Sequence, residues 1–297
     1  MDQTRQSYIY ALMAILFWST VPTAFKISLR DLDVLPMLTI ASFTSAFILS
    51  MVILTGKKIS LIKKTTWKEL LNSALLGFIN PFLYYIILLK AYQLLPAQVA
   101  QPLNMIWPII LVFLSVIILG QKIKKKSFIA LLISFLGVYI ISSQGKLFSS
   151  GHSDLTGVFL ATGSSIFWAI YFILNMKDKR DEAVKLFLNF LFASFYLAVA
   201  MTVTGKWNVD CKFAGTVASV YVGVFEMGIA FLFWLKALQM APTTDKVSNL
   251  VYLAPFISLV FVHFILHEPV YYTTPAGLLL IISGILIQNR KKQEINN

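Results

Sequence analysis

One acidic residue, Glu226, lies in the middle of a long apolar stretch of this chain. A carboxylate at the centre of a bilayer costs about 2.5–3.5 kcal/mol on insertion scales, so it has to face a cavity or a partner. Asn80, 146 residues earlier, is polar at the equivalent position of a similar stretch. The chemistry expected of Glu226 is binding of a solute ammonium group or carriage of a coupling proton. The alternative is a packing hydrogen bond made by its protonated form.

Two further stretches carry polar residues along one side of an expected helix. Their members are Asp245, Ser248, Asn249, Tyr252 and Phe256 in one, and Gln98, Gln101, Asn104 and Pro108 in the other. Spacings of three, four and seven residues place side chains on a common helical face. We expect Gln101, Asn249 and Tyr252 to line a solute cavity, whereas Asp245 and Gln98 lie near helix ends and are expected to be solvated. Interhelical hydrogen bonding, worth about 0.6 kcal/mol on average, is the competing interpretation.

Aromatic residues form another group of candidate contacts. Trp18 and Trp168 lie near the middle of apolar stretches, not at the headgroup level where tryptophan usually gathers. Tyr84 follows Asn80 by one helical turn. Such rings can form the wall of a cavity for an apolar or cationic solute, and core packing is the alternative.

The elements that must position these residues are membrane-spanning helices. Hydrophobic residues make up 58% of the 297 residues and charged residues only 13%, which excludes an ordinary soluble domain. The apolar blocks approach the roughly 20 residues that a helix needs to cross a bilayer. Lipid-exposed open strands would leave backbone groups unsatisfied, so an all-α fold is expected. The expected spans are at about 8–29, 35–55, 69–89, 97–119, 127–143, 155–176, 184–204, 213–235, 244–266 and 274–289.

The chain repeats itself once. Lys90, Ala91, Gln93 and Pro96 recur as Lys236, Ala237, Gln239 and Pro242 at a spacing of 146. Pro108 pairs with Pro255, Gln121 with Glu268 and Gly137 with Gly284 at a spacing of 147, and Phe17-Trp18 with Phe167-Trp168 at 150. So long a period indicates duplicated domains. We expect two five-helix halves, residues 1–147 and 148–297.

Lysine and arginine set the orientation. With the N-terminus inside, 19 of the 25 basic residues fall on the cytoplasmic side and 6 outside. This distribution predicts cytoplasmic termini and an external loop at 145–154. Five spans per half is an odd number, so the second half is inverted relative to the first. Inverted repeats are typical of secondary transporters, whose substrate site lies near the midplane between the halves.

These motifs resemble the drug/metabolite transporter superfamily, and its EamA type in particular. The resemblance rests on the A-x-Q-x-x-P motif of each half, the following helix with a proline inside its span, and a helix with a glycine after that. It implies ten helices around a central cavity built by the first, third, fourth, sixth, eighth and ninth. It also implies transport of small organic solutes, often amino acids or related metabolites. The sequence departs from the family pattern at Gln121, where glutamate is common, and at His267, where glycine would precede Glu268.

The sequence therefore predicts a multi-pass protein of the cytoplasmic membrane that moves a small organic metabolite by alternating access. An amino acid or related compound is the expected solute, export the expected direction, and a proton the candidate coupling ion. The net charge of +12 is spread over short loops, so nucleic acid is not an expected partner. With Cys211 as the one cysteine, neither a metal nor another cofactor is expected. We expect no enzymatic activity, and the alternative is an intramembrane enzyme or lipid-processing protein.

Overall fold

Helices account for all the regular structure in the part of the chain that the structure describes. This computed structural model describes residues 2–143, 154–208, 212–267 and 273–289. Its first half contains α1 (Gln3–Asp31), α2 (Val34–Thr55), α3 (Ile59–Lys63), α4 (Trp67–Gly77), η1 (Phe78–Leu83), α5 (Tyr84–Leu94), α6 (Ala97–Asn104), α7 (Trp107–Leu119) and α8 (Lys125–Ser142). Its second half contains α9 (Leu155–Lys177), α10 (Glu182–Val203), α11 (Phe213–Tyr221), η2 (Val222–Ala230), α12 (Phe231–Met240), α13 (Asp245–Ser248), η3 (Asn249–Tyr252), α14 (Leu253–Leu266) and α15 (Thr273–Asn289).

Seven of the helical segments in the described residues are long and apolar enough to cross a membrane. They are Gln3–Asp31, Val34–Thr55, Trp67–Leu94, Leu155–Lys177, Glu182–Val203, Phe213–Met240 and Asp245–Leu266. Trp107–Leu119 and Pro275–Gln288 are shorter apolar helices. The expected span 97–119 is divided into α6 and α7, because Pro108 occupies the first turn of α7, where a proline starts a helix but cannot continue one. The chain is thus an all-helical, multi-pass membrane protein.

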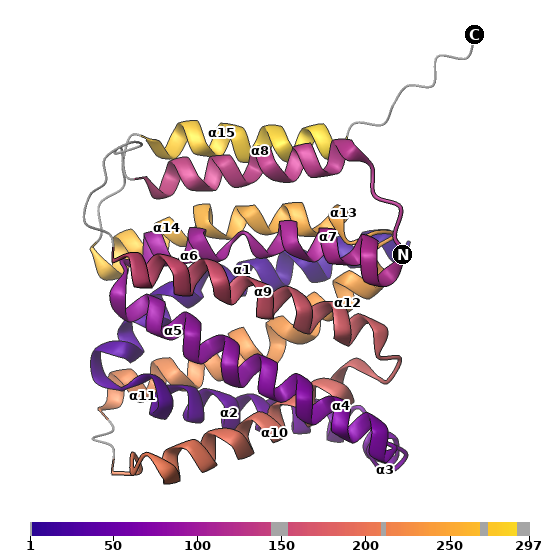
Figure 1. Ribbon diagram of the computed structural model, residues 1–297, viewed down its shortest axis with the longest axis vertical. Helices are drawn as coiled ribbons and strands as arrows, with labels where there is room; N and C mark the ends of the chain where they lie inside the picture. The colour runs from indigo at the N-terminus through magenta and orange to yellow at the C-terminus, as the bar shows by residue number, and fades with distance from the viewer. Residues whose placement is uncertain (1, 144–153, 209–211, 268–272, 290–297) are drawn as a thin grey trace.

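The first helix of each half packs mainly against helices of the other half (Figure 1). Helix α1 packs against α11, α12 and α14, whereas α9 packs against α5, α6 and α7. Helix α2 packs against α10. The middle of the molecule, where α1 and α9 lie, is therefore built from both halves.

Helices α8 and α15 form a separate outer layer, seen at the top of Figure 1. Gly137 of α8 faces the backbone of α15 so closely that a Cβ atom would overlap the carbonyl oxygen of Gly277. A Cβ atom on Gly284 would in turn overlap Ser134 and the Ala130 carbonyl of α8. Small residues that let helix backbones approach are typical of packing in membranes. This layer is held by close packing, as the two glycines predict.

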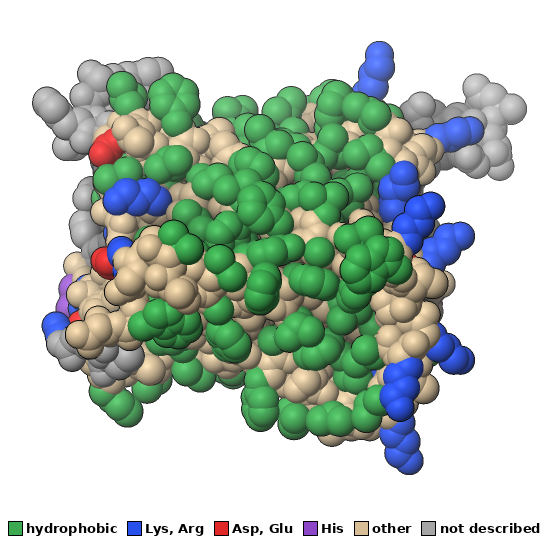
Figure 2. Space-filling view, turned by 60° about the horizontal axis from the view of Figure 1, so that its bottom comes forward, with side chains coloured by type: hydrophobic (Ala, Val, Ile, Leu, Met, Phe, Trp, Pro, Cys, Tyr) green, Lys and Arg blue, Asp and Glu red, His purple; other side chains and the backbone are tan. Residues whose placement is uncertain are grey.

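The outer surface has the polarity that a bilayer requires. Hydrophobic side chains cover the middle of the face shown in Figure 2, and blue Lys and Arg side chains gather along one edge. Large apolar residues such as Phe47, Phe159 and Leu279 are exposed there or elsewhere around the bundle. An apolar band of this extent is unusual for a soluble monomer and fits contact with lipid.

Candidate functional site

Two helices of the bundle are interrupted at equivalent positions of the sequence repeat, at η1 and η2. In the first half, η1 breaks the segment Trp67–Leu94 at Asn80, whose φ and ψ of −153° and 124° are extended. Pro81 explains this break, because proline lacks an N–H and pushes the preceding residue out of the helical region. In the second half, η2 widens the segment Phe213–Met240 into a π-helix without a proline. π-Helical stretches inside α-helices occur frequently at functional sites.

Glu226 lies inside η2 and is almost completely buried, with 5% of its surface exposed. Its Oε1 atom accepts a hydrogen bond of 2.6 Å from the Tyr85 hydroxyl of α5, in the other half of the chain. Its Oε2 atom has no hydrogen-bond partner. A buried carboxyl group with one oxygen unpaired costs free energy. The unpaired oxygen is therefore available to a proton or to a cationic group.

Four tryptophans form a cluster, and three of them, Trp18, Trp107 and Trp168, line the same cavity as this carboxyl group. Trp18 of α1 lies 5.6 Å from Trp168 of α9, 6.1 Å from Trp107 of α7 and 5.3 Å from Trp234 of α12, measured between ring centroids. The indole nitrogens of Trp18, Trp168 and Trp234 have no hydrogen-bond partner. Buried tryptophan normally finds a partner for its N–H. The cluster thus combines a large apolar surface with unpaired donors at the junction of the halves.

A cavity of about 40 Å³ opens between α1, α5, α6, α7, α9 and η2. Its lining consists of Trp18, Val21, Pro22, Phe25, Tyr84, Leu88, Tyr92, Gln101, Asn104, Met105, Trp107, Trp168 and Glu226. This volume holds about three water molecules. Binding a whole metabolite therefore requires the helices to separate, whereas a single head group needs much less movement.

Five of the eight predicted site residues lie together in the lining of this cavity, namely Trp18, Tyr84, Gln101, Trp168 and Glu226. The other three, Asn80, Asn249 and Tyr252, are fully buried and are not in the lining. Both polar side-chain atoms of Asn80 and of Asn249 lack a hydrogen-bond partner, as does the Tyr252 hydroxyl. These three residues carry buried polar groups that this conformation leaves unused.

The sequence interpretation overlooked several residues of the site. Tyr85 was not predicted, because its contact with Glu226 joins positions 141 residues apart and local sequence spacing does not indicate such a pair. Trp107 was not singled out although it follows Asn104 of the polar arc by three residues. Trp234, which packs on Trp18 without lining the cavity, lies in an apolar run without a polar neighbour at helical spacing. Asn104 was assigned to the polar arc but not to the site. Its amide accepts from the Tyr84 hydroxyl at 3.2 Å and donates to Ser164 at 2.9 Å, which ties α6 to α5 and α9.

The expectation that Asp245 is solvated was wrong. The residue is 2% exposed, because α8 and α15 cover the start of α13. Its Oδ2 atom accepts hydrogen bonds from Ser127 of α8 at 2.5 Å and from Gln288 of α15 at 3.1 Å. The side chain of Gln98 lies outside the described residues, as do Glu268 and the loop 145–153. Asp245 joins the outer layer to the core of the bundle.

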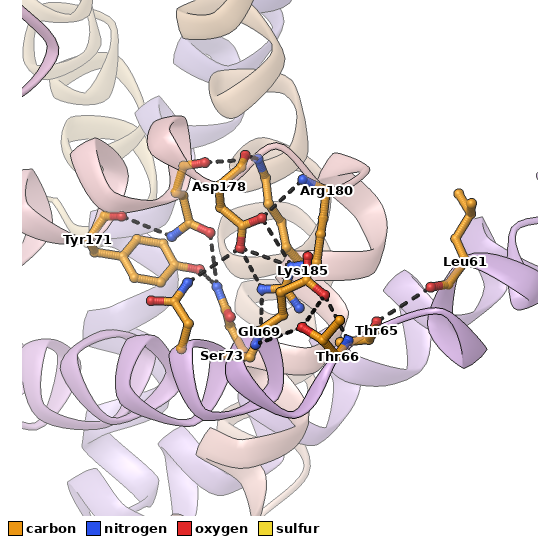
Figure 3. A network of polar contacts seen from close by, with 12 residues as sticks. Leu61, Thr65, Thr66, Glu69, Ser73, Tyr171, Asp178, Arg180 and Lys185 are labelled. Carbon is orange, nitrogen blue, oxygen red and sulfur yellow. Dashed lines mark hydrogen bonds and ion pairs between the residues drawn. The ribbon is translucent and has the colours of Figure 1, made fainter.

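A second polar network lies at the junction of α4, α9 and α10 (Figure 3). Arg180 donates from Nε to both carboxylate oxygens of Asp178 at 3.0 Å and from Nη2 to Ser73 at 2.9 Å. Burial raises the pKa of Asp178, but the hydrogen bonds from Arg180 outweigh burial and hold that pKa below its usual range. Lys185 donates to the main-chain oxygens of Asn175 and Asp178 at 2.8 and 2.6 Å. The network ties the end of α9 to α4 and α10.

Beside this network is a larger hollow of about 190 Å³, lined by Leu61, Lys64, Thr65, Glu69, Arg180, Asp181 and Val184. Three of its four charged side chains already have partners. Arg180 is bound to Asp178, Asp181 to Lys58 at 2.6 Å, and Glu69 to Thr66 at 2.7 Å. Despite its greater volume, the hollow therefore offers few charged side chains that could bind a ligand without breaking existing contacts. The cavity at Glu226 is therefore the better candidate site.

Comparison with known proteins identifies the family to which the chain is similar. Residues 5–143 and 155–290 each match the sequence model of the EamA-like transporter family. An uncharacterized transporter of Bacillus subtilis, YvbV, is 29% identical over 77% of this chain and 74% of its own length. An uncharacterized transporter of Archaeoglobus fulgidus is 24% identical over 97% of this chain and all of its own length. A protein of known crystal structure superposes with a TM-score of 0.79 at 18% identity, covering 95% of this chain and 96% of its own, which shows a shared fold.

Proposed function

The chain belongs to the EamA-like transporter family, and from that premise we propose that it is a secondary transporter. It moves a small organic metabolite, an amino acid or related compound, across the cytoplasmic membrane. Movement occurs by alternating access between residues 1–147 and 148–297, with export as the direction. The ten expected spans and two cytoplasmic termini complete the proposal.

The observation that carries this proposal is the position of Glu226. Its carboxyl group is buried at the junction of the halves, lines a cavity and is bonded to a phenol of the opposite half. An ionisable group within a membrane-spanning segment marks a substrate or ion pathway by default. A contact that crosses the halves is also the kind that changes when one half moves against the other.

The contacts between helices support two structurally similar halves. Helix α1 packs against α12 and α14, and α9 packs against α5 and α7. By position in the repeat, α5 corresponds to α12 and α7 to α14, so these contacts of the two first helices correspond. The pairs α2 with α10 and α8 with α15 join equivalent spans to each other. Such exchange symmetry is expected of repeats that rock about a shared centre.

The proposed orientation is supported by the basic edge in Figure 2 and can be tested with two exposed positions. Gln93 lies in the last turn of the third spanning segment, Trp67–Leu94, and Lys64 precedes that segment. In a variant lacking Cys211, cysteine at position 93 should react with an impermeant maleimide added to intact cells. Cysteine at position 64 should react only after permeabilisation. The opposite labelling pattern would show that the orientation is reversed. Equal labelling at both positions would contradict a membrane span between them.

In this orientation the cavity lies toward the external side. Its lining runs along α1 from Trp18 to Phe25 and reaches Tyr92 near the external end of α5. The network of Asp178, Arg180 and Lys185 holds helices together on the cytoplasmic side (Figure 3). A cavity nearer one side, with the helices tied together on the other, fits one of the states that alternating access requires.

The test is solute movement in vesicles that contain the purified protein and no ATP. A thermal-shift screen of amino acids and amines first selects a solute, since a ligand that binds the folded protein raises its melting temperature. We expect the labelled solute to cross the membrane chemically unchanged, faster than in protein-free vesicles. Recovery of a chemically altered compound would instead indicate the enzyme, and no flux of any stabilising compound would contradict transport.

A further inference from the structure

The charges around the cavity indicate which solutes it accepts. Among the described residues that line it, Glu226 is the acidic group, and none is lysine, arginine or histidine. We propose that the group bound at Glu226 is an organic ammonium, and that an amine without a carboxylate is preferred to the corresponding zwitterionic amino acid. This inference rests on the proposed transport function and narrows its substrate class.

The aromatic wall suits a cation. Trp168 lies with its ring centroid 4.9 Å from that of Tyr84, 5.6 Å from Trp18 and 5.7 Å from Trp107. All four rings line the same cavity as the Glu226 carboxyl group. Aromatic rings attract cations through the negative potential of their faces, and tryptophan does so most strongly. The volume of about 40 Å³ matches a head group and not a whole solute. The carboxyl group and the rings thus form a compact receptor for an ammonium group.

A solute carboxylate has no comparable partner in the cavity. Asn104 uses its amide in hydrogen bonds to Ser164 and Tyr84, which leaves Gln101 as the neutral amide in the lining. Lys26, the residue after Phe25, donates from Nζ to the main-chain oxygens of Tyr92 and Leu95 at 2.6 and 2.7 Å. Lys26 is not among the residues that line the cavity, so a carboxylate there would be buried without an adjacent cation, and a buried unpaired charge is strongly unfavourable.

The test compares three compounds that share a phenyl ring and a two-carbon chain. Phenethylamine is the cation, phenylalanine the zwitterion and 3-phenylpropanoate the anion. Binding to the purified wild-type protein is measured by calorimetry, and flux of the same compounds is measured in proteoliposomes. We expect phenethylamine to bind about tenfold more tightly than phenylalanine, because the zwitterion adds an unpaired buried charge. The anion should show no binding.

Two variants locate the preference. Glu226→Gln keeps the shape of the side chain, so it should fold with an unchanged melting temperature and lose the preference for the amine. Trp168→Leu should weaken phenethylamine binding by a factor of about 2–30, the range of one cation–π contact. Trp67→Leu is the matched control, because Trp67 is 71% exposed and is not in the lining of the cavity. This variant should bind like wild type.

The outcomes separate this inference from the transport proposal. Phenylalanine or the anion binding as tightly as the amine, an amine preference that survives in Glu226→Gln, or no binding of phenethylamine at millimolar concentrations would each overturn the inference. If phenylalanine is carried across the membrane while the amine is not bound, the protein is still a transporter and the ammonium site is wrong. Preferred binding of the amine together with its flux supports both.

Discussion

The two interrupted helices, at η1 and η2, occupy equivalent positions in the two halves but carry different side chains. Asn80 in η1 is fully buried, and both polar atoms of its side chain lack a partner. Glu226 in η2 lies 146 residues later, lines the cavity and is bonded to Tyr85. Both halves keep a polar side chain at the same depth, but only one of the two positions carries a titratable group and an aromatic wall.

This difference indicates that duplication supplies the framework and divergence supplies the site. The packing of α1 on α12 and α14 corresponds to the packing of α9 on α5 and α7, and this correspondence supports the proposed rocking of the halves. These contacts do not explain the proposed binding site, whose carboxyl group comes from the second half and most of whose lining comes from the first. A buried amide without a partner costs about 1–3 kcal/mol. If the protein alternates between two states as proposed, Asn80 is expected to find a partner in the other state.

The strongest way to break the comparison is to exchange the two side chains. Glu226→Asn makes the two positions alike and should reduce transport by a factor of about 30 or more, since losing a buried partner of a charge costs about 2–5 kcal/mol. The double variant Asn80→Glu, Glu226→Asn should remain inactive, because position 80 is not in the cavity lining. The initial rate of solute flux in proteoliposomes measures both. Wild-type rates in the double variant would mean that the positions are interchangeable.

Removing the phenol that distinguishes the two positions should have the next largest effect. Tyr85→Phe deletes the hydrogen bond to Glu226. A bond to a charged group contributes about 1.5–3 kcal/mol, so solute affinity should change about ten- to hundredfold. Tyr84→Phe deletes a longer bond to the neutral Asn104 amide and should cost about tenfold at most. Equal effects of the two variants on KM would show that the contact between Tyr85 and Glu226 has no special role.

The smallest effect is expected at the uncharged position. Asn80→Leu replaces a buried, unpartnered amide with an apolar side chain of similar size, so the resting protein should be as stable as wild type or more stable. Its melting temperature should stay constant or rise by about 2–4 °C per kcal/mol gained. Turnover should fall several-fold if the amide is needed in the other state. Full turnover with unchanged stability would leave Asn80 without a role in the cycle.

The sequence reveals the framework and part of the site for physical reasons that individual residues illustrate. Glu226, Trp18 and Trp168 could be found because a charge or an indole at mid-membrane depth needs an explanation that lipid does not provide. Asp245 was misjudged, because its position near a helix end suggests solvent, whereas α8 and α15 cover it. Tyr85 was missed since its partner lies in the other half. Local periodicity predicts which face of a helix is polar, but not which distant element packs on it.

The break between α6 and α7 also could not be predicted from local sequence. Pro108 is plain in the sequence, yet the apolar run around it looks continuous, so 97–119 was expected to be one span. Where a proline starts a new helix and where it only bends one depends on neighbours that accept or replace the freed backbone hydrogen bonds. That information enters with the tertiary structure.

The most direct test of the central claim is solute movement driven by a pH gradient, with wild type and Glu226→Gln measured side by side. The titratable groups that interact with Glu226 among the described residues are the phenols of Tyr84 and Tyr85, so loss of titration at position 226 should dominate the result. Proteoliposomes are loaded with phenethylamine or with the solute that the thermal-shift screen selects, and an outwardly or inwardly directed proton gradient is imposed. The account predicts that wild type concentrates the solute in response to the gradient, whereas Glu226→Gln, folded and equally stable, does not. Gradient-driven accumulation by Glu226→Gln at the wild-type rate and at every pH would contradict it.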